Sequence, residues 1–460
     1  MHDLNTEALD ELEILLYYEY LDTLRNDFWK FCLYFDPDFF EERPFLKECA
    51  ELFQSVYEGT YKKVSISLPP RYGKSYLTSI YCLWVLGNNP SASILRTSCT
   101  VTLANKFSYD IRGFVSDPRT LEVFPDLKLA PDKAAIGAWN TTESISVGYL
   151  SGGAGSTIIG FGAETIAICD DTVKDVEMAM SEPQLQKLWE WFGGMFRSRK
   201  EKGCPEIHIG TRWSRRDVIG KLEGTKEFDK QIIIPALTKD NKSFCEDIIS
   251  TEDLLIQKRN LPTAIFEAEY QQNPIEAKGL LYPRDQLNYF KGKVNIDTPV
   301  ISVVDVADTG SDYLSAIFAK TDGNKVYVID VLFTQESVET TELALTAKLI
   351  KHNVSVCRIE SNNAGRIFAL NIKALIKSQN GTTEVQTRVT KTNKEARMYL
   401  TSSYVINNFY FRSDAQGNYI PYFSQLVSTF KNVAKNIHDD AADSTTMMAE
   451  YVKNSLMHNW

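Results

Sequence analysis

The residues best suited to phosphate chemistry lie in one stretch, SISLPPRYGKS at positions 65–75. An apolar run from Val64 to Leu68 begins it, and a helix-like segment from Tyr76 to Leu86 follows it. A loop between a strand and a helix points successive backbone N–H groups at a polyphosphate, and the helix N-terminus adds partial positive charge. Lys74 would neutralise the β- and γ-phosphates, and Ser75 would place its hydroxyl on Mg²⁺. The stretch therefore predicts a nucleotide-binding site.

This loop departs from the common phosphate-binding pattern at one position. The pattern G-x-x-x-x-G-K-[ST] has a glycine where this chain has Leu68. The same residues also fit an ordinary turn between a strand and a helix with a surface lysine. The apolar run before the loop and the helix behind it favour nucleotide binding, because the pattern requires that context.

Two acids end a later apolar run and suit the same site. The run Thr165-Ile-Ala-Ile-Cys is followed directly by Asp170 and Asp171. Such a run is typical of a buried parallel strand, whose carboxyl end is where α/β sheets place ligand groups. Asp170 would hold Mg²⁺, and Asp171 would orient the attacking water, a role that P-loop motors usually give to Glu. A strand-end cap is the alternative, and the phosphate loop upstream favours the nucleotide site.

A third apolar run, from Glu206 to Trp213, includes Thr211 and Arg212 near its end. A strand beside the phosphate-loop strand would present one of these side chains to the γ-phosphate, where it would couple hydrolysis to movement. A surface loop after a strand explains the same residues equally well.

A second set of acids lies in the C-terminal third of the chain. Asp305 stands inside the apolar run from Val300 to Val306, where a carboxylate is costly unless a cation pairs with it. Glu360 ends a later strand-like run, and Asp440 opens the last helix. Mg²⁺ and Mn²⁺ prefer oxygen ligands, and two such ions about 4 Å apart promote phosphodiester cleavage. Together the three acids predict a two-ion nuclease site, although caps and salt bridges use the same residue types.

The last helix offers three acids as candidate ligands. Helical spacing places Asp440 on an apolar face with Met447 and Met448, so we expect its side chain to point toward the sheet. The same spacing puts Asp443 at the margin of a more solvated face, and Asp439 is able to cap the helix. Asp440 and Asp443 are both kept as metal ligands, and the choice among the three acids stays open.

The elements that must position these residues alternate between strand and helix, which predicts an α/β protein. In the C-terminal third, three strands precede a helix and a fourth strand, and Thr321-Asp-Gly-Asn marks the turn between the second and third strands. This order of strands, helices and acids resembles an RNase H-like nuclease. The expected parts are an ATPase domain at 1–245 with a helical segment at 1–60, a connector at 246–295 and a nuclease domain at 296–460.

Length and composition narrow the class of protein. The length of 460 residues favours two domains. The net charge of −10 argues against a protein that coats nucleic acid over its whole surface. The eight cysteines form no C-x-x-C pair, so we expect reduced core residues rather than structural zinc. No signal peptide is recognisable and no apolar run approaches ~20 residues, so we expect neither secretion nor a membrane span.

Taken together, the two sets of motifs resemble the large subunit of tailed-phage terminases, the DNA-packaging motor. The family's Pro-Pro-Arg-x-Gly-Lys-Ser loop matches Pro69 to Ser75, and its Gly-Thr-Arg-Trp motif matches Gly210 to Trp213. The other matches are Asp170-Asp171 with the run to Asp175, the Tyr-Gln-Gln-Asn-Pro stretch from Tyr270 to Pro274, and the nuclease acids Asp305, Glu360 and Asp440. The resemblance covers most of the chain, and its motifs are specific only in combination.

The resemblance implies an α/β fold, with an N-terminal P-loop ATPase domain built on a mainly parallel sheet and a C-terminal RNase H-like nuclease domain. It implies an ATP-driven translocase that moves double-stranded DNA into a procapsid and an endonuclease that cuts concatemeric DNA. ATP and Mg²⁺ would bind the first domain, and two ions of Mg²⁺ or Mn²⁺ the second. The implied site also includes Pro70, Arg71, Tyr72 and Gly73, with Arg71 acting in its own subunit, and Asp312 near the metals.

The resemblance further implies partners and a location. The partners are double-stranded DNA, a portal protein, a small terminase subunit and further copies of the chain in a ring on the procapsid, with a monomer in solution also compatible. The location is the cytoplasm of a bacterial host. Basic clusters at 197–202, 215–216 and 388–394 are candidates for phosphate contacts, although each taken singly fits a solvated surface.

Three other classes of protein fit part of the sequence. A DNA helicase or translocase with a non-cleaving RNase H-like module would tolerate loss of the carboxylates. A portal adaptor with a vestigial nucleotide loop fits Leu68 but not the retention of Lys74 and Asp170. A transposase or integrase would share the acidic triad but has no need of an N-terminal ATPase.

Overall fold

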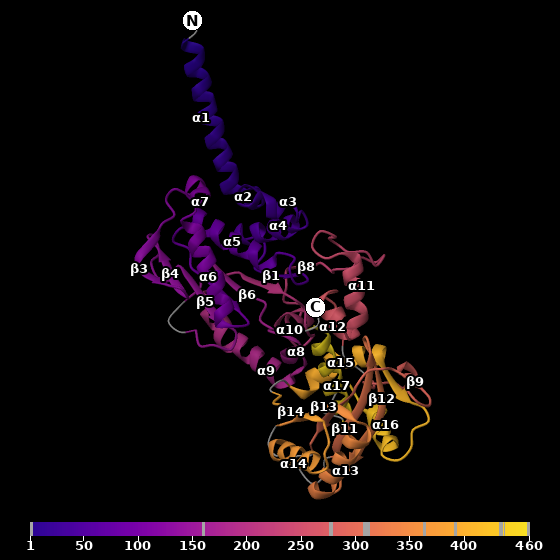
Figure 1. Ribbon diagram of the computed structural model, residues 1–460. Coiled ribbons are helices and arrows are strands. Elements are labelled where there is room, and N and C mark those ends of the chain that lie inside the picture. Colours follow the sequence, from indigo (N-terminus) through magenta and orange to yellow (C-terminus); the bar gives the residue numbers. More distant parts are fainter. Residues whose placement is uncertain are drawn as a thin grey trace. The chain divides into compact units, whose positions relative to one another are not determined.

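The chain forms two compact units whose residues are interleaved along the sequence. The structure is a computed structural model and describes residues 3–158, 162–275, 279–306, 313–361, 365–390, 393–431, 436 and 438–457. The first unit comprises residues 1–255 and 265–275, and the second comprises residues 256–264 and 276–460. Figure 1 colours the chain from the indigo N-terminus to the yellow C-terminus. The stretch expected to be a connector is therefore divided between the two units.

A mainly parallel sheet forms the centre of the first unit. Among the described residues it has eight strands in the order β3-β4-β5-β2-β6-β7-β1-β8. Their bounds are β1 (Lys63–Ser67), β2 (Ile94–Ser98), β3 (Leu129–Ala135), β4 (Ala138–Thr141), β5 (Tyr149–Gly153), β6 (Ile166–Asp170), β7 (Glu206–Gly210) and β8 (Lys230–Ile233). All pairs from β5 to β8 in this order are parallel, and β4 pairs antiparallel with β3 and β5.

The strand order explains how residues far apart in the sequence meet. β7 pairs with β1 on one side and with β6 on the other, in parallel register. Parallel strands end at the same edge of a sheet, so the residues that follow β1, β6 and β7 come together there. Every residue of β2, β6 and β7 is buried, which is typical of a parallel sheet covered on both faces.

The first twelve helices along the described chain surround or extend from these strands, and side-chain caps fix where several of them begin. Their bounds are α1 (Asp3–Asn26), α2 (Phe28–Phe35), α3 (Pro37–Glu41), α4 (Leu46–Tyr57), α5 (Lys74–Asn88), α6 (Val101–Val115), α7 (Pro118–Val123), α8 (Val176–Met180), α9 (Glu182–Trp191), α10 (Val218–Gly224), α11 (Thr251–Asn260) and α12 (Thr263–Glu269). Thr100 caps α6 by accepting a hydrogen bond from the Leu103 N–H. Asp217 caps α10 by accepting one from the Gly220 N–H.

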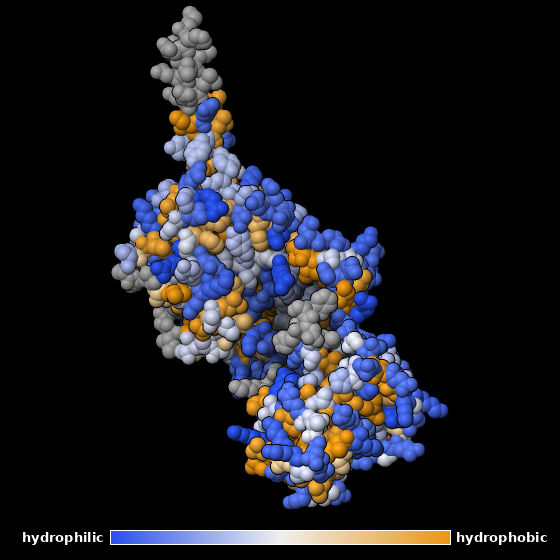
Figure 2. Space-filling model, in the orientation of Figure 1, coloured by the Kyte–Doolittle hydropathy of each residue, from blue (hydrophilic) through white to orange (hydrophobic). Residues whose placement is uncertain are grey.

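The first helix differs from the others in the apolar surface that it exposes. Figure 2 shows apolar residues gathered on α1. Leu12, Ile14, Leu15 and Leu16 are each at least 51% exposed, and the neighbouring aromatic residues Tyr17, Tyr18 and Tyr20 are each at least 44% exposed. Within the part of the chain that the structure describes, no helix has both the length and the hydropathy needed to cross a membrane.

The second unit is built on a mixed sheet. In the described ranges it has seven strands in the order β14-β13-β10-β11-β12-β15-β9. Their bounds are β9 (Asn288–Phe290), β10 (Val300–Asp305), β11 (Leu314–Asp322), β12 (Lys325–Thr334), β13 (Val354–Glu360), β14 (Glu384–Arg388) and β15 (Phe409–Arg412). β10, β11 and β12 form an antiparallel meander, and β13 lies parallel to β10 on its other side. The predicted three-stranded meander followed by a fourth strand is confirmed.

Helices of the second unit bring the last acids to this sheet. Their bounds are α13 (Val338–Lys351), α14 (Gly365–Ser378), α15 (Lys394–Asn408), α16 (Tyr419–Ser428) and α17 (Asp440–Met457). α17 packs on β10 and β11 and also contacts α15 and α16. β10 and β13 end next to each other because they are parallel neighbours, and the first turn of α17 brings Asp443 to that edge. The α/β class predicted for both halves is confirmed.

Candidate functional sites

The loop between β1 and α5 turns sharply and places Lys74 at the start of the helix. Gly73 has a φ of 90°, a left-handed conformation that glycine adopts without strain. A Cβ there would lie 2.8 Å from Cζ of Phe39. Leu68, which stands where the common pattern has glycine, is fully buried. It therefore contributes to the core beneath the loop rather than to the turn itself.

The remaining loop residues differ in their surroundings. Arg71 has a φ of 70° and an exposed side chain, and Pro70 is half-buried. Tyr72 is buried, and its ring lies 5.6 Å from that of Phe45, centroid to centroid. Tyr72 thus anchors the loop to the helical segment that precedes it.

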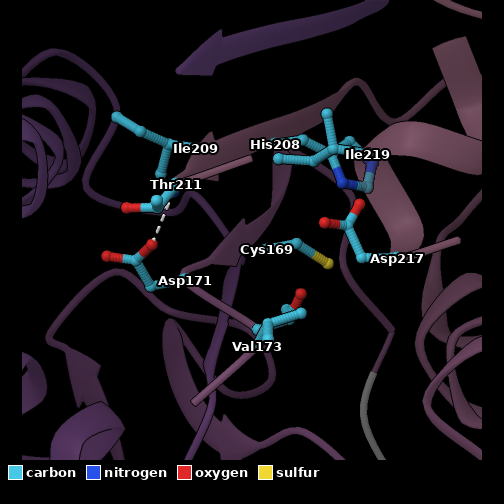
Figure 3. A pocket seen from close by; sticks show the side chains of 10 residues that line it. Cys169, Asp171, Val173, His208, Ile209, Thr211, Asp217 and Ile219 are labelled. Atoms are coloured by element: carbon cyan, nitrogen blue, oxygen red, sulfur yellow. Dashed lines mark hydrogen bonds between the residues drawn. The ribbon is translucent and has the colours of Figure 1, made fainter. Parts of the chain in front are cut away.

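Three residues predicted for the nucleotide site meet at the edge of the sheet. Nζ of Lys74 lies 3.0 Å from Oδ2 of Asp171 and 3.3 Å from Oγ1 of Thr211. Oδ1 of Asp171 accepts a hydrogen bond of 2.9 Å from the Thr211 N–H, the dashed line in Figure 3. Lys74 is only 7% exposed, so these contacts are sheltered from water. A loop after β1 and the ends of β6 and β7 therefore share one polar cluster.

The other acid of the pair, Asp170, is held by an arginine that the sequence analysis did not select. Ser75 Oγ donates to Oδ1 of Asp170 over 3.1 Å, and Nε of Arg96 donates to Oδ2 over 3.2 Å. Arg96 and Asp170 are 1% and 0% exposed. Burial raises the pKa of the Asp170 carboxyl, and the positive charge of Arg96 opposes that rise. An arginine at the end of an apolar run was the one signal available in the sequence.

Arg212 does not join the lysine cluster. Its N–H donates to Oε1 of Gln272 over 3.0 Å, and its guanidinium donates to the Gln272 carbonyl and pairs with Glu223. Gln272 is 1% exposed and has a φ of 54°. The residue next to Thr211 is therefore clamped to the Tyr270–Pro274 stretch, which is part of the first unit.

A further carboxylate lies near Lys74 at the end of α12. Burial raises the pKa of Glu269, and the charge of Lys74 counteracts that rise. Its position is fixed by neighbouring bonds: Gln272 Nε2 donates to the Glu269 carbonyl over 2.6 Å, and the Ala236 N–H donates to the Tyr270 carbonyl over 2.7 Å. The sequence analysis missed Glu269 because an acid in a helix carries no pattern of its own.

A small cavity lies beside Asp171 (Figure 3). It is lined by Cys169, Asp171, Thr172, Val173, His208, Ile209, Gly210, Thr211, Asp217 and Ile219. Burial raises the pKa of Asp217 to about 6, although the N–H groups of Gly220 and Ser214 donate to its carboxylate. The carboxylates of Asp171 and Asp217 thus both border this cavity.

Three acids of the second unit form a compact group. Asp305, Glu360 and Asp443 each offer an oxygen, and these atoms lie within 4.8 Å of one another. Burial raises the pKa of Asp305 well above its usual range, and the charges of Asp443 and Glu360 add to that rise. Burial and Asp443 likewise raise the pKa of Glu360. Asp312, expected near these acids, lies outside the described residues.

The expected environment of Asp443 is wrong. Helical spacing placed it at the margin of a solvated face, but it is 4% exposed and belongs to the acid group. The reason is that α15 covers this face of α17. Thr401 of α15 donates to Thr446 over 3.3 Å, and Nε of Arg397 lies 3.0 Å from Oε1 of Glu450.

Asp440 is buried as expected but does not belong to the compact group. It is 7% exposed, and its charge contributes to the raised pKa of Asp305 after the charges of Asp443 and Glu360. Asp439 contacts Nζ of Lys394 at 2.8 Å. The structure thus brings Asp443, rather than Asp440, to Asp305 and Glu360.

The donor set of the acid group fits a hard divalent cation. All of its ligand atoms are carboxylate oxygens, the ligands that Mg²⁺ and Mn²⁺ prefer. Close carboxylates in a partly buried site repel one another, and the raised pKa values of Asp305 and Glu360 reflect burial first and that repulsion second. A cation bound between the acids would remove it.

Comparison with known proteins agrees with this geometry. Residues 304–409 match a family model described as the ribonuclease H-like domain of the bacteriophage T7 terminase. The large terminase of a thermophilic bacteriophage has 11% sequence identity and a TM-score of 0.50, over 85% of this chain and 93% of that chain. The chain has the fold of a phage large terminase subunit. The predicted resemblance is confirmed, and so are an α/β fold on a mainly parallel sheet in the first unit and an RNase H-like fold in the second.

Isolated terminase domains also match part of the chain. The ATPase domain of the Thermus phage P74-26 large terminase covers 48% of this chain and 93% of its own, with 12% identity and a TM-score of 0.34. The human cytomegalovirus terminase nuclease domain covers 37% of this chain and 94% of its own, with 15% identity and a TM-score of 0.30. No curated protein matches the sequence.

Proposed function

We propose that the chain is a subunit of a viral DNA-packaging motor. It hydrolyses ATP to translocate double-stranded DNA into a procapsid, and it cuts concatemeric DNA with a two-metal endonuclease. The ATPase function is assigned to residues 1–245 and the nuclease function to residues 296–460, with 246–295 between them. The observation that carries the proposal is the group formed by Asp305, Glu360 and Asp443 within 4.8 Å, in a chain whose other unit gathers Lys74, Asp171 and Thr211 at the end of a parallel sheet.

In the ATPase site, each residue has a role that follows from its contacts. The loop from Pro70 to Gly73 and the start of α5 would bind the phosphates of ATP through backbone N–H groups, and Lys74 would bind their charge. Ser75 and Asp170 share a hydrogen bond and would hold Mg²⁺. Asp171 already lies 3.0 Å from the lysine ammonium and would orient the attacking water.

Arg96, Thr211 and Arg212 would support this chemistry from the protein side. Arg96 fixes Asp170 from within the core. Thr211 contacts both Lys74 and Asp171, and the N–H of the next residue, Arg212, donates to Gln272. A displacement of Lys74 or Asp171 would therefore be passed through Thr211 to the contact between Arg212 and Gln272. This connection would couple hydrolysis to movement of the Tyr270–Pro274 stretch. Arg71 is exposed and would contact the nucleotide from its own loop.

In the nuclease site, Asp305, Glu360 and Asp443 would hold Mg²⁺ or Mn²⁺, with Asp440 and Asp312 as further acids of the site. Divalent ions bound there would activate water and stabilise the leaving oxygen of a phosphodiester. The chain's own residues position the ligands: β10 and β13 are parallel neighbours, and α17 packs against β10.

The proposed partners follow from the terminase resemblance. They are double-stranded DNA, a portal protein, a small terminase subunit and neighbouring copies of the chain in a ring on the procapsid, and the proposed location is the bacterial cytoplasm. The terminase fold supports this assignment.

Cleavage of supercoiled plasmid and ATP turnover by the same protein test the proposal. Wild type should cut in Mg²⁺ or Mn²⁺ but not in EDTA, and Asp305→Ala should lose cutting while it retains ATP turnover. Lys74→Ala should show the opposite pattern. ATP turnover without cleavage in any metal would instead favour a helicase or translocase whose RNase H-like module does not cleave.

A further inference from the structure

A lysine ammonium lies among the acids of the nuclease unit. Nζ of Lys394 is 2.8 Å from Oδ1 of Asp439 and 3.1 Å from Oδ2 of Asp443. Asp443 is also one of the three residues whose oxygens lie within 4.8 Å of one another. The lysine therefore contacts the same carboxylate that the proposed metal would use.

The place of Lys394 in its helix is unfavourable on its own. It is the first residue of α15, and the positive end of a helix dipole disfavours a cation there. Burial also disfavours the charged form, yet the nearby charges of Asp443, Asp439 and Asp305 raise the pKa of Lys394 above its usual value. The acids of the nuclease unit are thus what stabilises a positive charge at this position.

A second cation faces Asp443 but is fixed. NH2 of Arg397 lies 3.6 Å from Oδ1 of Asp443, while its Nε lies 3.0 Å from Oε1 of Glu450, and its side chain is 7% exposed. The Lys394 side chain is 38% exposed and ends a flexible four-carbon stem. Of these two cations, Lys394 is the one that is free to leave the carboxylate.

We propose that Lys394 is a positioning residue that takes the place of a cation in the acid group and is displaced from Asp443 when a divalent metal binds. This inference rests on the proposed nuclease function. In the metal-free protein the ammonium offsets part of the repulsion among Asp305, Glu360 and Asp443 and keeps these side chains together. A metal must compete with the ammonium for Asp443, so Lys394 weakens metal binding while it keeps the ligands assembled.

Mn²⁺ binding to the full-length chain tests the competition. Free Mn²⁺ is measured by electron paramagnetic resonance, without nucleotide and at one pH of about 8 for all proteins, where carboxylates of ordinary pKa are ionised. The proteins are wild type, Lys394→Met, Lys394→Arg and Asp443→Asn. Lys373→Met, which changes an exposed lysine of α14, is the matched control. If Lys394→Met does not fold, Lys394→Gln is measured in its place.

Lys394→Met should bind Mn²⁺ on the order of tenfold more tightly than wild type, because removing one positive charge beside a ligand changes cation affinity by about one logarithmic unit or more. Its melting temperature in EDTA should fall, and Mn²⁺ should raise it by more than in wild type. Lys394→Arg and Lys373→Met should keep the wild-type affinity. Unchanged or weaker Mn²⁺ binding by Lys394→Met would overturn the inference, since a merely structural lysine predicts that result.

The same titration separates this inference from the proposed function. Asp443→Asn should lose the Mn²⁺ site that Lys394→Met strengthens. If Asp443→Asn binds Mn²⁺ as wild type does, the metal site itself is wrong and the inference falls with it. If Asp443→Asn loses the site while Lys394→Met leaves its affinity unchanged, the nuclease site stands and only the competition is refuted.

Discussion

Replacing Arg96 with methionine should destabilise the first unit strongly, because the change leaves the Asp170 carboxylate unpaired in the core. Arg96 and Asp170 are 1% and 0% exposed. Breaking a buried ion pair by removing one partner costs about 3–5 kcal/mol. Arg96 also donates to Oγ of Ser79 and to the Ser75 carbonyl, and each of these bonds contributes roughly 1 kcal/mol. The expected loss is therefore about 5–7 kcal/mol, which is large beside the 5–15 kcal/mol that is typical of whole proteins.

Urea denaturation followed by tryptophan fluorescence measures this loss. Every tryptophan except Trp460 lies in the first unit, so the signal reports that unit rather than the second. The proteins to compare are wild type, Arg96→Met and the double variant Arg96→Met/Asp170→Asn. The double variant should recover most of the loss, because a neutral amide needs no counter-charge.

The pH dependence of the Arg96→Met variant provides an internal check. Without the arginine, the folded state raises the pKa of Asp170 above the value of about 3.9 in the unfolded chain. The stability from protonating this carboxyl is fully present below that value and is lost as pH rises through the folded pKa. The loss should thus be smaller at about pH 5 than at about pH 8. A loss below about 1 kcal/mol, or a double variant no more stable than the single one, would refute the reasoning.

Three further predictions concern the other site residues. Asp443→Asn should reduce plasmid cleavage by more than roughly 100-fold, the upper end of the loss expected when a residue that only supports a metal ligand is changed. Asp440→Asn should reduce cleavage by less than that. Equal losses in the two variants would count against the compact group. Burial raises the pKa of Asp217 to about 6, so its contribution to stability is complete below about pH 4 and is lost as pH rises through about 6. Asp217→Asn should flatten the urea stability profile over that range, and an unchanged slope would contradict it. Gln272→Ala should slow ATP turnover roughly tenfold by removing the hydrogen bond to the Arg212 N–H, and wild-type turnover would show that the clamp is dispensable.

The nucleotide cluster was predictable because its residues follow strands. Asp171 and Thr211 come directly after the strands β6 and β7, and Lys74 follows β1 after a short loop, while the ends of neighbouring parallel strands share one edge. The ion pair of Arg96 was not predictable, because its partner is 74 residues away and a single arginine in a short strand has no periodicity. Glu269 was missed because the approach of α12 to Lys74 depends on tertiary contacts around Gln272.

The acids of the last helix show a different limit of sequence reasoning. Helical periodicity gives the angle between Asp440 and Asp443, but it does not tell which neighbouring element covers each side. α15 covers the side of Asp443, through Arg397 and Thr401. Both acids are therefore buried, and only the three-dimensional arrangement of β10, β13 and α17 decides which of them joins Asp305 and Glu360.

The interleaving of the two units has a consequence for genetic dissection of the protein. Residues 265–275 group with the first unit and 256–264 with the second, so no single cut yields both halves intact. A fragment ending at residue 255 would lack Gln272 and leave Arg212 without its clamp. A fragment starting at residue 276 would lack Arg259, whose carbonyl accepts a hydrogen bond from Asn407. Overlapping fragments of residues 1–275 and 256–460, which share both exchanged segments, are therefore the pair to use in complementation experiments.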